Sequence, residues 1–360
     1  MGYNSSLFKK FSEKGYPYRL LNSLDVSSLK NKVINAKQSN SCPKFGISRI
    51  EICLTSSCNY RCRFCYGKYL KPRNIPVDNE LPIELIRNNI LIDIRKNKKF
   101  LKQNPIIVLG GLYSEPLFYS KINQLIKLFK RYHFRFGIYT NGFFLNRDIQ
   151  KIICENAVTY NNNPSYISFN FTSSFIHGNW HSLLEKIKNI VELRNKTHSL
   201  LKINVPILIL EDSEELLKEL EKIQKFLLKI GVDAIRYAFP QEPVRPILPL
   251  QARIYKLIDS LKKSGEGHVY IRLPSKPFTR CFVMCMSVAI DSRGDVYPCS
   301  QTCTSYFKKL SFGSIARQRF SEIWYSKKHV KLFQEFNPEI LNCRCNVLDE
   351  QFNRICANFY

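Results

Sequence analysis

Between residues 46 and 240, short runs rich in apolar and β-branched residues alternate with longer stretches of helical periodicity. The apolar runs predict six strands, over Ile47–Leu54, Pro105–Leu109, Phe134–Thr140, Tyr166–Phe171, Leu201–Leu210 and Ala234–Phe239. Strands that alternate with helices are typical of parallel βα units. The sequence therefore predicts an α/β fold with a parallel sheet, although periodicity alone does not distinguish a barrel from an open sheet.

Two of the intervening segments show the clearest helical pattern. One begins at Ser213, a residue type that often caps a helix N-terminus, and ends at Gly231, a typical C-terminal stop. The other spans His181–Lys196, where leucine, isoleucine and valine recur at helical spacing. Both helices are predicted to cover the sheet with an apolar stripe.

The chain has 360 residues, of which 44% are hydrophobic, so about two domains with full cores are expected. No apolar stretch reaches the roughly 18 residues that span a bilayer, and Met1–Phe11 lacks the apolar segment of a signal peptide. We therefore predict a cytoplasmic protein without membrane contact. In a long chain without an export signal, the 13 cysteines favour metal ligation over disulfides.

The formal net charge of +26 is compatible with an acidic partner such as RNA or an anionic peptide. The basic residues are dispersed, however, and no basic block or Arg/Gly tail stands out. Lysines on solvated helix faces, in a chain also rich in Asn and Ile, explain the charge without such a partner. A nucleic-acid partner is therefore kept as an alternative but is not favoured.

Cys58, Cys62 and Cys65 follow the first predicted strand, in the run Ser57-Cys58-Asn59-Tyr60-Arg61-Cys62-Arg63-Phe64-Cys65. Three thiolates at this spacing are suited to hold three irons of a [4Fe–4S] cluster, which normally takes four Cys. The fourth iron would then need another ligand. A zinc knuckle is the alternative, but structural zinc sites take four ligands, and no fourth Cys or His follows closely in the sequence.

This Cys-x3-Cys-x2-Cys motif, with the aromatic Phe64 before its last Cys, resembles the signature of the radical S-adenosylmethionine (SAM) superfamily. The resemblance implies that SAM binds the open iron and that an electron from the cluster cleaves SAM to a 5′-deoxyadenosyl radical. It also implies a partial (β/α)6 TIM-like barrel, to which the six predicted βα units correspond.

The family's second strand ends in Gly-Gly-Glu-Pro, which resembles Gly110-Gly111-Leu112-Tyr113-Ser114-Glu115-Pro116 here. Gly110 and Gly111 are expected near the SAM amino group, and Glu115 is included as a cofactor-binding candidate despite the three inserted residues. The Thr140-Asn141-Gly142 run after the third strand is also similar to the family, with Asn141 as the candidate. A plain turn is the alternative for each of these loops.

Polar residues interrupt the later apolar strands. Ser168 and Asn170 share one face of the fourth strand, Asn204 lies on the fifth and Arg236 on the sixth. Polar groups that point into a barrel need partners. The resemblance implies that these residues contact the ribose and carboxylate of SAM, and that Phe64 packs near its adenine. Asn170 stands where the family often has an acid.

Seven cysteines lie beyond residue 280. Gly294 to Cys299 gives Gly-x4-Cys, which together with Cys281 resembles the SPASM and twitch auxiliary-cluster domains of radical SAM enzymes. The distal Cys pattern departs from SPASM, so we predict one auxiliary [4Fe–4S] cluster held by Cys281, Cys299, Cys343 and Cys345, with Cys285, Cys303 and Cys356 as competing ligands. A structural zinc is the alternative. Cys42, Cys53 and Cys154 are predicted to be buried core thiols.

Four segments follow from these patterns. We predict an N-terminal extension over residues 1–45 that packs on the barrel, a radical SAM partial barrel over 46–240, a connector over 241–280 and a small Cys-rich α+β SPASM/twitch-like domain over 281–360. The connector is predicted to contain one helix, Leu250–Lys263.

The function that the resemblance implies is oxidoreductase-type radical SAM chemistry: hydrogen abstraction from a peptide, protein or small-molecule substrate. An external reductant such as flavodoxin or ferredoxin is expected as a partner. The alternatives are radical SAM modification of RNA and a non-catalytic iron–sulfur electron carrier or sensor. The catalytic side chain, the substrate and the fate of SAM are left open.

Overall fold

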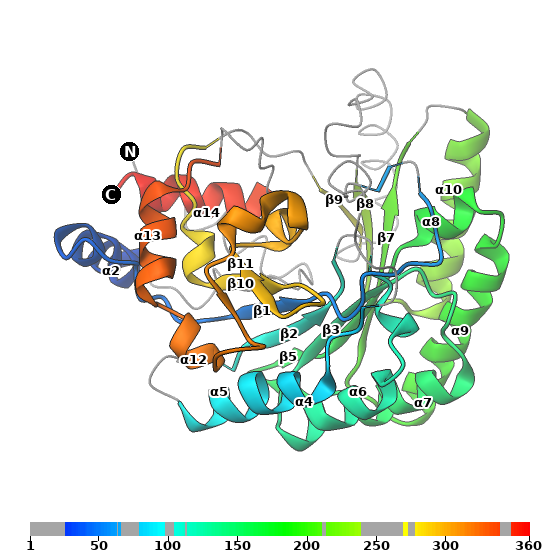
Figure 1. Ribbon diagram of the computed structural model, residues 1–360. Helices are drawn as coiled ribbons and strands as arrows, with labels where there is room; N and C mark the ends of the chain where they lie inside the picture. Colours follow the sequence, from blue (N-terminus) through cyan, green and yellow to red (C-terminus); the bar gives the residue numbers. More distant parts are fainter. Residues whose placement is uncertain are drawn as a thin grey trace.

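The computed structural model describes residues 26–62, 64–65, 79–97, 104–111, 114–210, 214–238, 269–272, 278–338 and 347–360. Within these residues the main sheet contains, in chain order, β1 (Arg49–Ile52), β2 (Ile106–Leu109), β3 (Phe136–Thr140), β6 (Tyr166–Phe169), β7 (Lys202–Leu208), β8 (Ala234–Ala238), β9 (Val269–Arg272), β10 (Ser287–Ile290), β11 (Asp295–Tyr297) and β12 (Gly313–Ser314). A separate hairpin pairs β4 (Thr159–Tyr160) with β5 (Asn163–Pro164). The spatial order in the main sheet is β12-β11-β10-β1-β2-β3-β6-β7-β8-β9 (Figure 1).

The six strands predicted from the sequence are present as β1, β2, β3, β6, β7 and β8, and neighbouring members of this set pair in parallel. Helices connect them, as the alternating pattern predicts. This arrangement confirms the α/β fold with a parallel sheet.

The helices in the described residues begin with α2 (Val26–Gln38) and a continuous segment made of α4 (Ile83–Leu85), the π-helix η1 (Ile86–Ile92) and α5 (Asp93–Lys96). After β2 come the 3₁₀ turn η3 (Pro116–Phe118), α6 (Ile122–Arg131), α7 (Arg147–Glu155), α8 (Phe171–Ile176), α9 (Trp180–Lys196) and α10 (Glu214–Ile230). The C-terminal region contributes η4 (Val283–Cys285), η5 (Ser300–Thr302), η6 (Ser305–Leu310), α12 (Phe320–Ile323), α13 (Lys327–Glu335) and α14 (Val347–Ala357).

The observed helices match the two clearest sequence predictions. The predicted helix over His181–Lys196 is α9, and the predicted helix that stops at Gly231 is α10, with Gly231 in the left-handed conformation at φ +88°. Its predicted cap, Ser213, and the predicted helix Leu250–Lys263 lie outside the described residues.

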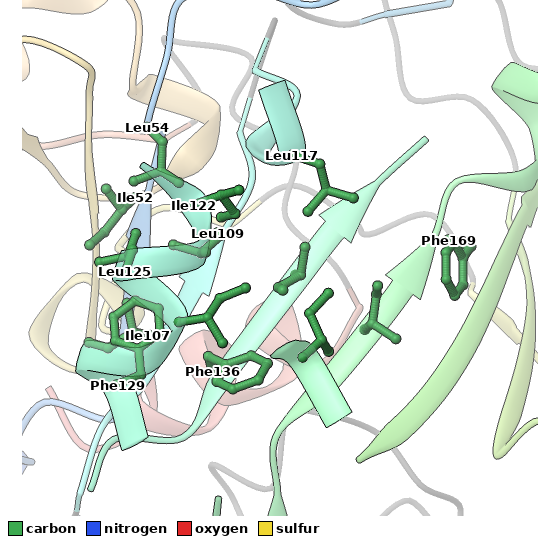
Figure 2. Close-up of a cluster of buried hydrophobic side chains, with 14 of the residues drawn as sticks. Ile52, Leu54, Ile107, Leu109, Leu117, Ile122, Leu125, Phe129, Phe136 and Phe169 are labelled. Carbon is green, nitrogen blue, oxygen red and sulfur yellow. The ribbon is translucent and has the colours of Figure 1, made fainter. Parts of the chain in front are cut away.

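The two faces of the parallel sheet differ in chemistry because successive side chains of a strand point in opposite directions. On the outer face, Ile52 of β1, Ile107 and Leu109 of β2 and the α6 residues Leu125 and Phe129 belong to one buried core (Figure 2). On the other face β1 carries polar groups, and its Arg49 guanidinium donates to the Glu51 carboxylate. β2 carries Ile106 and Val108 there, which pack with Tyr166. The helices therefore cover the outer face and leave an interior lined by both polar and apolar side chains.

The sheet extends beyond the six predicted strands at both edges. β9 lies in the segment predicted as a connector and pairs in parallel with β8. At the opposite edge β10 pairs in parallel with β1, and β11 and β12 continue the sheet in antiparallel pairing. The backbone of the cysteine-rich C-terminal region is thus hydrogen-bonded directly to the first strand of the barrel.

The prediction that the N-terminal extension packs on the barrel is wrong for its described part. Leu29 and Val33 of α2 share a buried core with Phe282, Phe333 and Phe352 of the C-terminal region, and Figure 1 shows α2 beside α13 and α14. The burial of the apolar face of α2 against these phenylalanines explains the placement.

Candidate functional site

Loops at the carboxyl ends of the strands meet because neighbouring strands are parallel. The loop after β1 carries Cys58, Cys62 and Cys65, the loop after β2 carries Gly110 and Gly111, and the loop after β3 carries Asn141. In parallel βα folds this end of the sheet is where active sites form.

The three thiols of the β1 loop are partly exposed. The backbone N–H of Cys65 donates to the Cys62 carbonyl (3.1 Å), and the Arg61 guanidinium donates to the Cys58 carbonyl (2.6 Å). Burial raises the pKa of Cys58 to about 12, and the nearby charges of Glu115, Cys62 and Cys65 act in the same direction. A metal that binds here must therefore displace protons from thiols.

The donor set fits an iron–sulfur group that binds thiolates. Soft thiolate ligands select iron–sulfur clusters or zinc, and the three thiols lie on one short loop, with Phe64 partly exposed in its turn. Among the described residues, no three His, Cys, Asp or Glu side chains already stand close enough together to hold a metal ion. The three thiols therefore fit an iron–sulfur group by their chemistry and by their place on one loop. They must move closer together when the group binds.

Glu115 ties the loops of this site together. Its backbone N–H donates to the Ser57 carbonyl (3.0 Å), next to Cys58. Its carboxylate accepts from the Thr140 hydroxyl (2.5 Å), the Asn141 N–H (2.8 Å) and the Leu117 N–H (3.1 Å). The side chain is only 2% exposed, and burial raises its pKa to about 7 despite these donors. Glu115 thereby joins the loops after β1, β2 and β3.

Asn141 extends the same link to the cysteine loop. Its Nδ2 donates to Asn59 Oδ1 (2.8 Å) and lies 3.9 Å from Cys58 Sγ, while its Oδ1 accepts from the Phe143 N–H (2.9 Å). The next residue, Gly142, has φ +75°, and a Cβ there would lie 2.3 Å from Leu183 Cδ1. Both the conformation and the space require glycine after Asn141.

Gly111 also requires glycine. It has φ +125°, and an added Cβ would lie 2.0 Å from Cys53 Sγ. Cys53 is buried and its sulfur lies 3.9 Å from Cys303 Sγ of the C-terminal region. The turn Gly110–Gly111 therefore rests directly on a thiol at the junction with that region, where only a backbone without a side chain fits.

His177 was not recognised from the sequence, yet its Nε2 lies 3.6 Å from Cys62 Sγ. Its ring packs on the Tyr60 ring with the centroids 4.3 Å apart, and Asn179 Nδ2 donates to the Tyr60 hydroxyl. His177 follows α8, 112 positions beyond the last cysteine of the motif. Only the fold brings the two segments together, so sequence spacing contained no signal for it.

The predicted polar residues of the later strands lie on the inner face. Ser168 of β6 and Asn204 of β7 are buried and are neighbours in register. Arg236 is partly exposed on β8, and Asn170 is exposed at the end of β6, where its N–H donates to the Thr140 carbonyl (2.7 Å). The sheet therefore brings these candidates to the same interior face, with Asn170 nearest the loops.

Three further inner residues, Arg49, Glu51 and Tyr139, were missed, although the alternation Arg-Ile-Glu-Ile in β1 was a usable signal. Burial alone would raise the pKa of Tyr139, but the positive charges of Arg49 and Arg236 and a hydrogen bond from Tyr166 hold it below its ordinary value. Arg49 lies on β1 and Arg236 on β8, at well-separated places in the strand order. Their shared influence on one phenol indicates that the sheet curves around its interior face.

Of the four predicted auxiliary ligands, Cys343 and Cys345 lie outside the described residues. Cys281 is buried and Cys299 partly exposed, and the Cys299 charge contributes to raising the pKa of Cys281 to about 12, after burial. The competitors Cys285 and Cys356 share one buried core with Cys281 and Cys42, whereas Cys303 lies beside Cys53. Cys154 is buried in the main core, as predicted.

Comparisons with known proteins agree with this geometry. A family model described as "Radical SAM superfamily" matches residues 52–223, and the SPASM model, described as an iron–sulfur cluster-binding domain, matches residues 281–346. A sequence relative, the tungsten-containing aldehyde ferredoxin oxidoreductase cofactor-modifying protein of Pyrococcus furiosus, is 25% identical over 307 residues, which are 77% of this chain and 80% of the relative.

Two solved structures share the fold. Streptococcus suis SuiB bound to the precursor peptide SuiA aligns with a TM-score of 0.62 and 15% identity, over 92% of this chain and 80% of that one. The protein anSMEcpe with bound AdoMet aligns with a TM-score of 0.54 and 13% identity, over 80% of this chain and 83% of that one. Among the described helices, none is long and apolar enough to cross a membrane.

Proposed function

Since this chain belongs to the radical SAM superfamily and carries a C-terminal SPASM region, we propose that it removes a hydrogen atom from a peptide or protein substrate. The radical SAM domain implies a [4Fe–4S] cluster and SAM, and the SPASM region implies auxiliary iron–sulfur clusters. The structural likeness to SuiB, which binds a precursor peptide, supports the peptide class. A small-molecule cofactor is the second candidate, since the Pyrococcus furiosus relative is named for modifying one.

One observation carries the proposal: a single loop presents Cys58, Cys62 and Cys65 at the carboxyl end of β1, and Glu115 connects this loop to the β2 and β3 loops. We assign the three thiolates as the ligands of the SAM-binding cluster. When bound, this cluster and SAM supply the one-electron cleavage that yields the 5′-deoxyadenosyl radical.

The chain's own residues would bind and orient SAM. Gly110 and Gly111 present bare backbone, Asn141 fixes the neighbouring loop, and Ser168, Asn170, Asn204 and Arg236 offer polar groups from the interior. Phe64 remains the proposed adenine neighbour. The Glu115 carboxylate already accepts three hydrogen bonds, so we assign it a role in positioning the loops.

For the C-terminal region we propose an oxidoreductase-type role, in which an auxiliary cluster held by Cys281, Cys299, Cys343 and Cys345 accepts an electron or binds substrate. The charge of Cys299 raises the pKa of Cys281, so the two thiols lie near each other, which supports both as ligands. Cys285 and Cys356 remain competing ligands, since both share a buried core with Cys281. A one-electron donor such as flavodoxin or ferredoxin would reduce the SAM-binding cluster.

The test is 5′-deoxyadenosine formation by protein that has been reconstituted anaerobically and supplied with dithionite and SAM. We expect formation by the wild type and by Cys154→Ala, a matched change of a buried thiol in the main core, and none by Cys58→Ala. Formation that survives Cys58→Ala would refute the proposal.

Metal analysis addresses the zinc alternative. His177 lies close enough to Cys62 that a Cys3His zinc site is chemically conceivable. The proposed function predicts iron in the purified protein, and it predicts that His177→Ala retains that iron. Stoichiometric zinc that is lost with His177→Ala would instead establish the structural site.

A further inference from the structure

A row of aromatic side chains runs along the segments that follow the carboxyl ends of β1, β2, β3 and β6. We call it the aromatic ridge and define it as Phe118, Phe144, Phe143, Tyr60 and His177. Successive ring centroids lie 5.1 Å, 5.0 Å, 6.2 Å and 4.3 Å apart along this sequence. The ridge is therefore one continuous surface feature built from segments that are far apart in the chain.

The ridge is exposed to solvent. Phe143 is 50% and Phe118 45% exposed, and they are two of the four exposed large hydrophobic side chains among the described residues. Of the other two, Tyr160 lies in the β4–β5 hairpin and Leu200 in the loop before β7. Exposed apolar side chains that gather in one place mark interaction sites more often than isolated ones do.

One end of the ridge touches the proposed cluster site. His177 Nε2 lies 3.6 Å from Cys62 Sγ, and Tyr60 stands between Cys58 and Cys62 in the chain. The ridge reaches this sulfur from the loops, whereas Ser168 and Asn204 lie on the interior face of the sheet. Its position suits the delivery of electrons to the cluster better than the binding of a substrate in the interior.

The charges beside the Tyr60 and Phe143 end of the ridge are positive, whereas near Phe118 the Glu80 carboxylate accepts from the Ser120 N–H (2.7 Å). The exposed Arg61 donates to the Tyr60 carbonyl (3.3 Å), and Lys186 Nζ lies 5.8 Å from the Phe143 ring centroid. The nearby carboxylate of Glu115 is buried under the loops. Together with the net charge of +26, these cations favour a partner with an acidic surface, because complementary charge speeds encounter.

We propose that the aromatic ridge is the docking surface for a small acidic one-electron carrier protein that bears a reduced flavin or an iron–sulfur centre. The proposal rests on the proposed function, which requires a reduced cluster. In the step itself the carrier loses one electron and the cluster gains one, and no bond forms or breaks. Electron-transfer partners bind through small, transient interfaces, a description that fits a short apolar ridge flanked by cations.

The test measures how fast the reconstituted full-length protein is reduced, by following the bleaching of cluster absorbance. The donors are an acidic flavodoxin hydroquinone, a reduced acidic ferredoxin and dithionite, a small reductant that needs no docking surface. The key variant is Phe143→Glu, which removes apolar surface, adds a negative charge and leaves the backbone bond from Phe143 N–H to Asn141 intact. Leu200→Glu makes the same change at a distant exposed site, and Phe143→Leu keeps the surface apolar.

We expect Phe143→Glu to slow reduction by at least one protein donor about fivefold or more, and added salt to slow the wild type. Phe143→Leu and Leu200→Glu should stay within about twofold of the wild type, and dithionite should reduce all four proteins equally. The faster protein donor identifies the prosthetic group. If Phe143→Glu does not fold, Phe118→Glu replaces it.

Three results would overturn the proposal: equal rates for wild type and Phe143→Glu with both protein donors, equal slowing of the variant with dithionite, or no reduction of the wild type by either protein. Deoxyadenosine formation with dithionite is scored separately in every variant. If only docking fails, the protein still forms deoxyadenosine with dithionite. If the proposed function fails, no deoxyadenosine forms with dithionite either.

Discussion

At the scale of single residues, Glu115 shows what motif matching can and cannot predict. The position of Gly110 and Gly111 after the second strand follows from the sequence, and so does their lack of side chains. The three inserted residues left the role of Glu115 open. In the folded chain the Glu115 carboxylate accepts hydrogen bonds from Thr140 and Asn141. The sequence did not predict these bonds, because hydrogen bonds between loops depend on the curvature of the sheet.

Glu115→Ala should destabilise the metal-free protein by about 3 kcal/mol, since three donors inside the protein lose their acceptor. Glu115→Gln should cost less, because it keeps one acceptor oxygen. Urea unfolding measures both. Glu84→Ala, which removes an exposed carboxylate 3.8 Å from Lys121, is the control and should stay within about 0.5 kcal/mol of the wild type. Equal stability of Glu115→Ala and Glu84→Ala would contradict the role assigned to Glu115.

His177→Ala should lower the reduction potential of the SAM-binding cluster. An N–H donor at Cys62 Sγ stabilises the more negative, reduced state, so its removal favours oxidation. A hydrogen bond worth about 1 kcal/mol corresponds to about 40 mV for one electron. EPR-monitored redox titration without SAM measures the shift. His181→Ala, at an exposed position of α9, should leave the potential unchanged, and an unshifted potential in His177→Ala would exclude the contact.

At the scale of elements, the strands and helices of the alternating βα pattern were predictable, and the strands outside it were not. The α9 and α10 helices and the six inner strands follow from periodicity. β9 and β10 have four residues each, as β1, β2 and β6 do, so length does not separate them. They lie outside the alternating βα pattern, and they pair with the edges offered by β8 and β1. α2 could be predicted as a helix, but its partner could not, because amphipathic periodicity gives an apolar face without saying what covers it.

The anchoring of α13 predicts a pH dependence. His329 of α13 is fully buried, accepts from the Tyr325 N–H at Nδ1 (3.1 Å) and donates from Nε2 to the Met284 carbonyl (3.0 Å). Burial lowers the pKa of His329 to about 4 from an ordinary value of 6.5. The folded state thus holds the neutral ring, and its stabilisation is present above pH 6.5 and lost as the pH falls towards 4.

Lowering the pH from about 7 to about 4.5 should therefore remove about 2 to 3 kcal/mol of stability through His329 alone. Urea unfolding of the metal-free wild type and of His329→Gln at both values measures it. His329→Gln should be less stable than the wild type at pH 7 but should lose less stability on acidification. Because the other titrating groups are the same in both proteins, the difference between the two losses isolates the contribution of His329. Equal losses in both proteins would refute this assignment.

At the scale of the whole molecule, the way the first strand joins the C-terminal region was not predicted from the sequence. β1 has a parallel neighbour on each side, β2 from the barrel and β10 from the C-terminal region. The backbone N–H of Cys53 donates to the Ile290 carbonyl (2.8 Å), five residues before Cys58. Cysteine spacing contains no information about this pairing, which depends on backbone groups.

A chain that ends at residue 280 should therefore aggregate. It would expose the hydrogen-bonding edge of β1 and lose Val288 and Ile290 from the main core. Size-exclusion chromatography, dye binding to exposed apolar surface and the iron content after reconstitution would show large species, strong dye fluorescence and little iron. A monomer with a full complement of iron would show that the two regions fold independently.

The pairing of β1 with β10 also sets the order of events as the chain leaves the ribosome. Ser48 and its partner Met286 are 238 positions apart, so the nascent strand that leads into the cysteine loop waits for its second neighbour until most of the polypeptide has been synthesised. Such distant contacts slow folding. We therefore expect metal insertion to be a late, post-translational event.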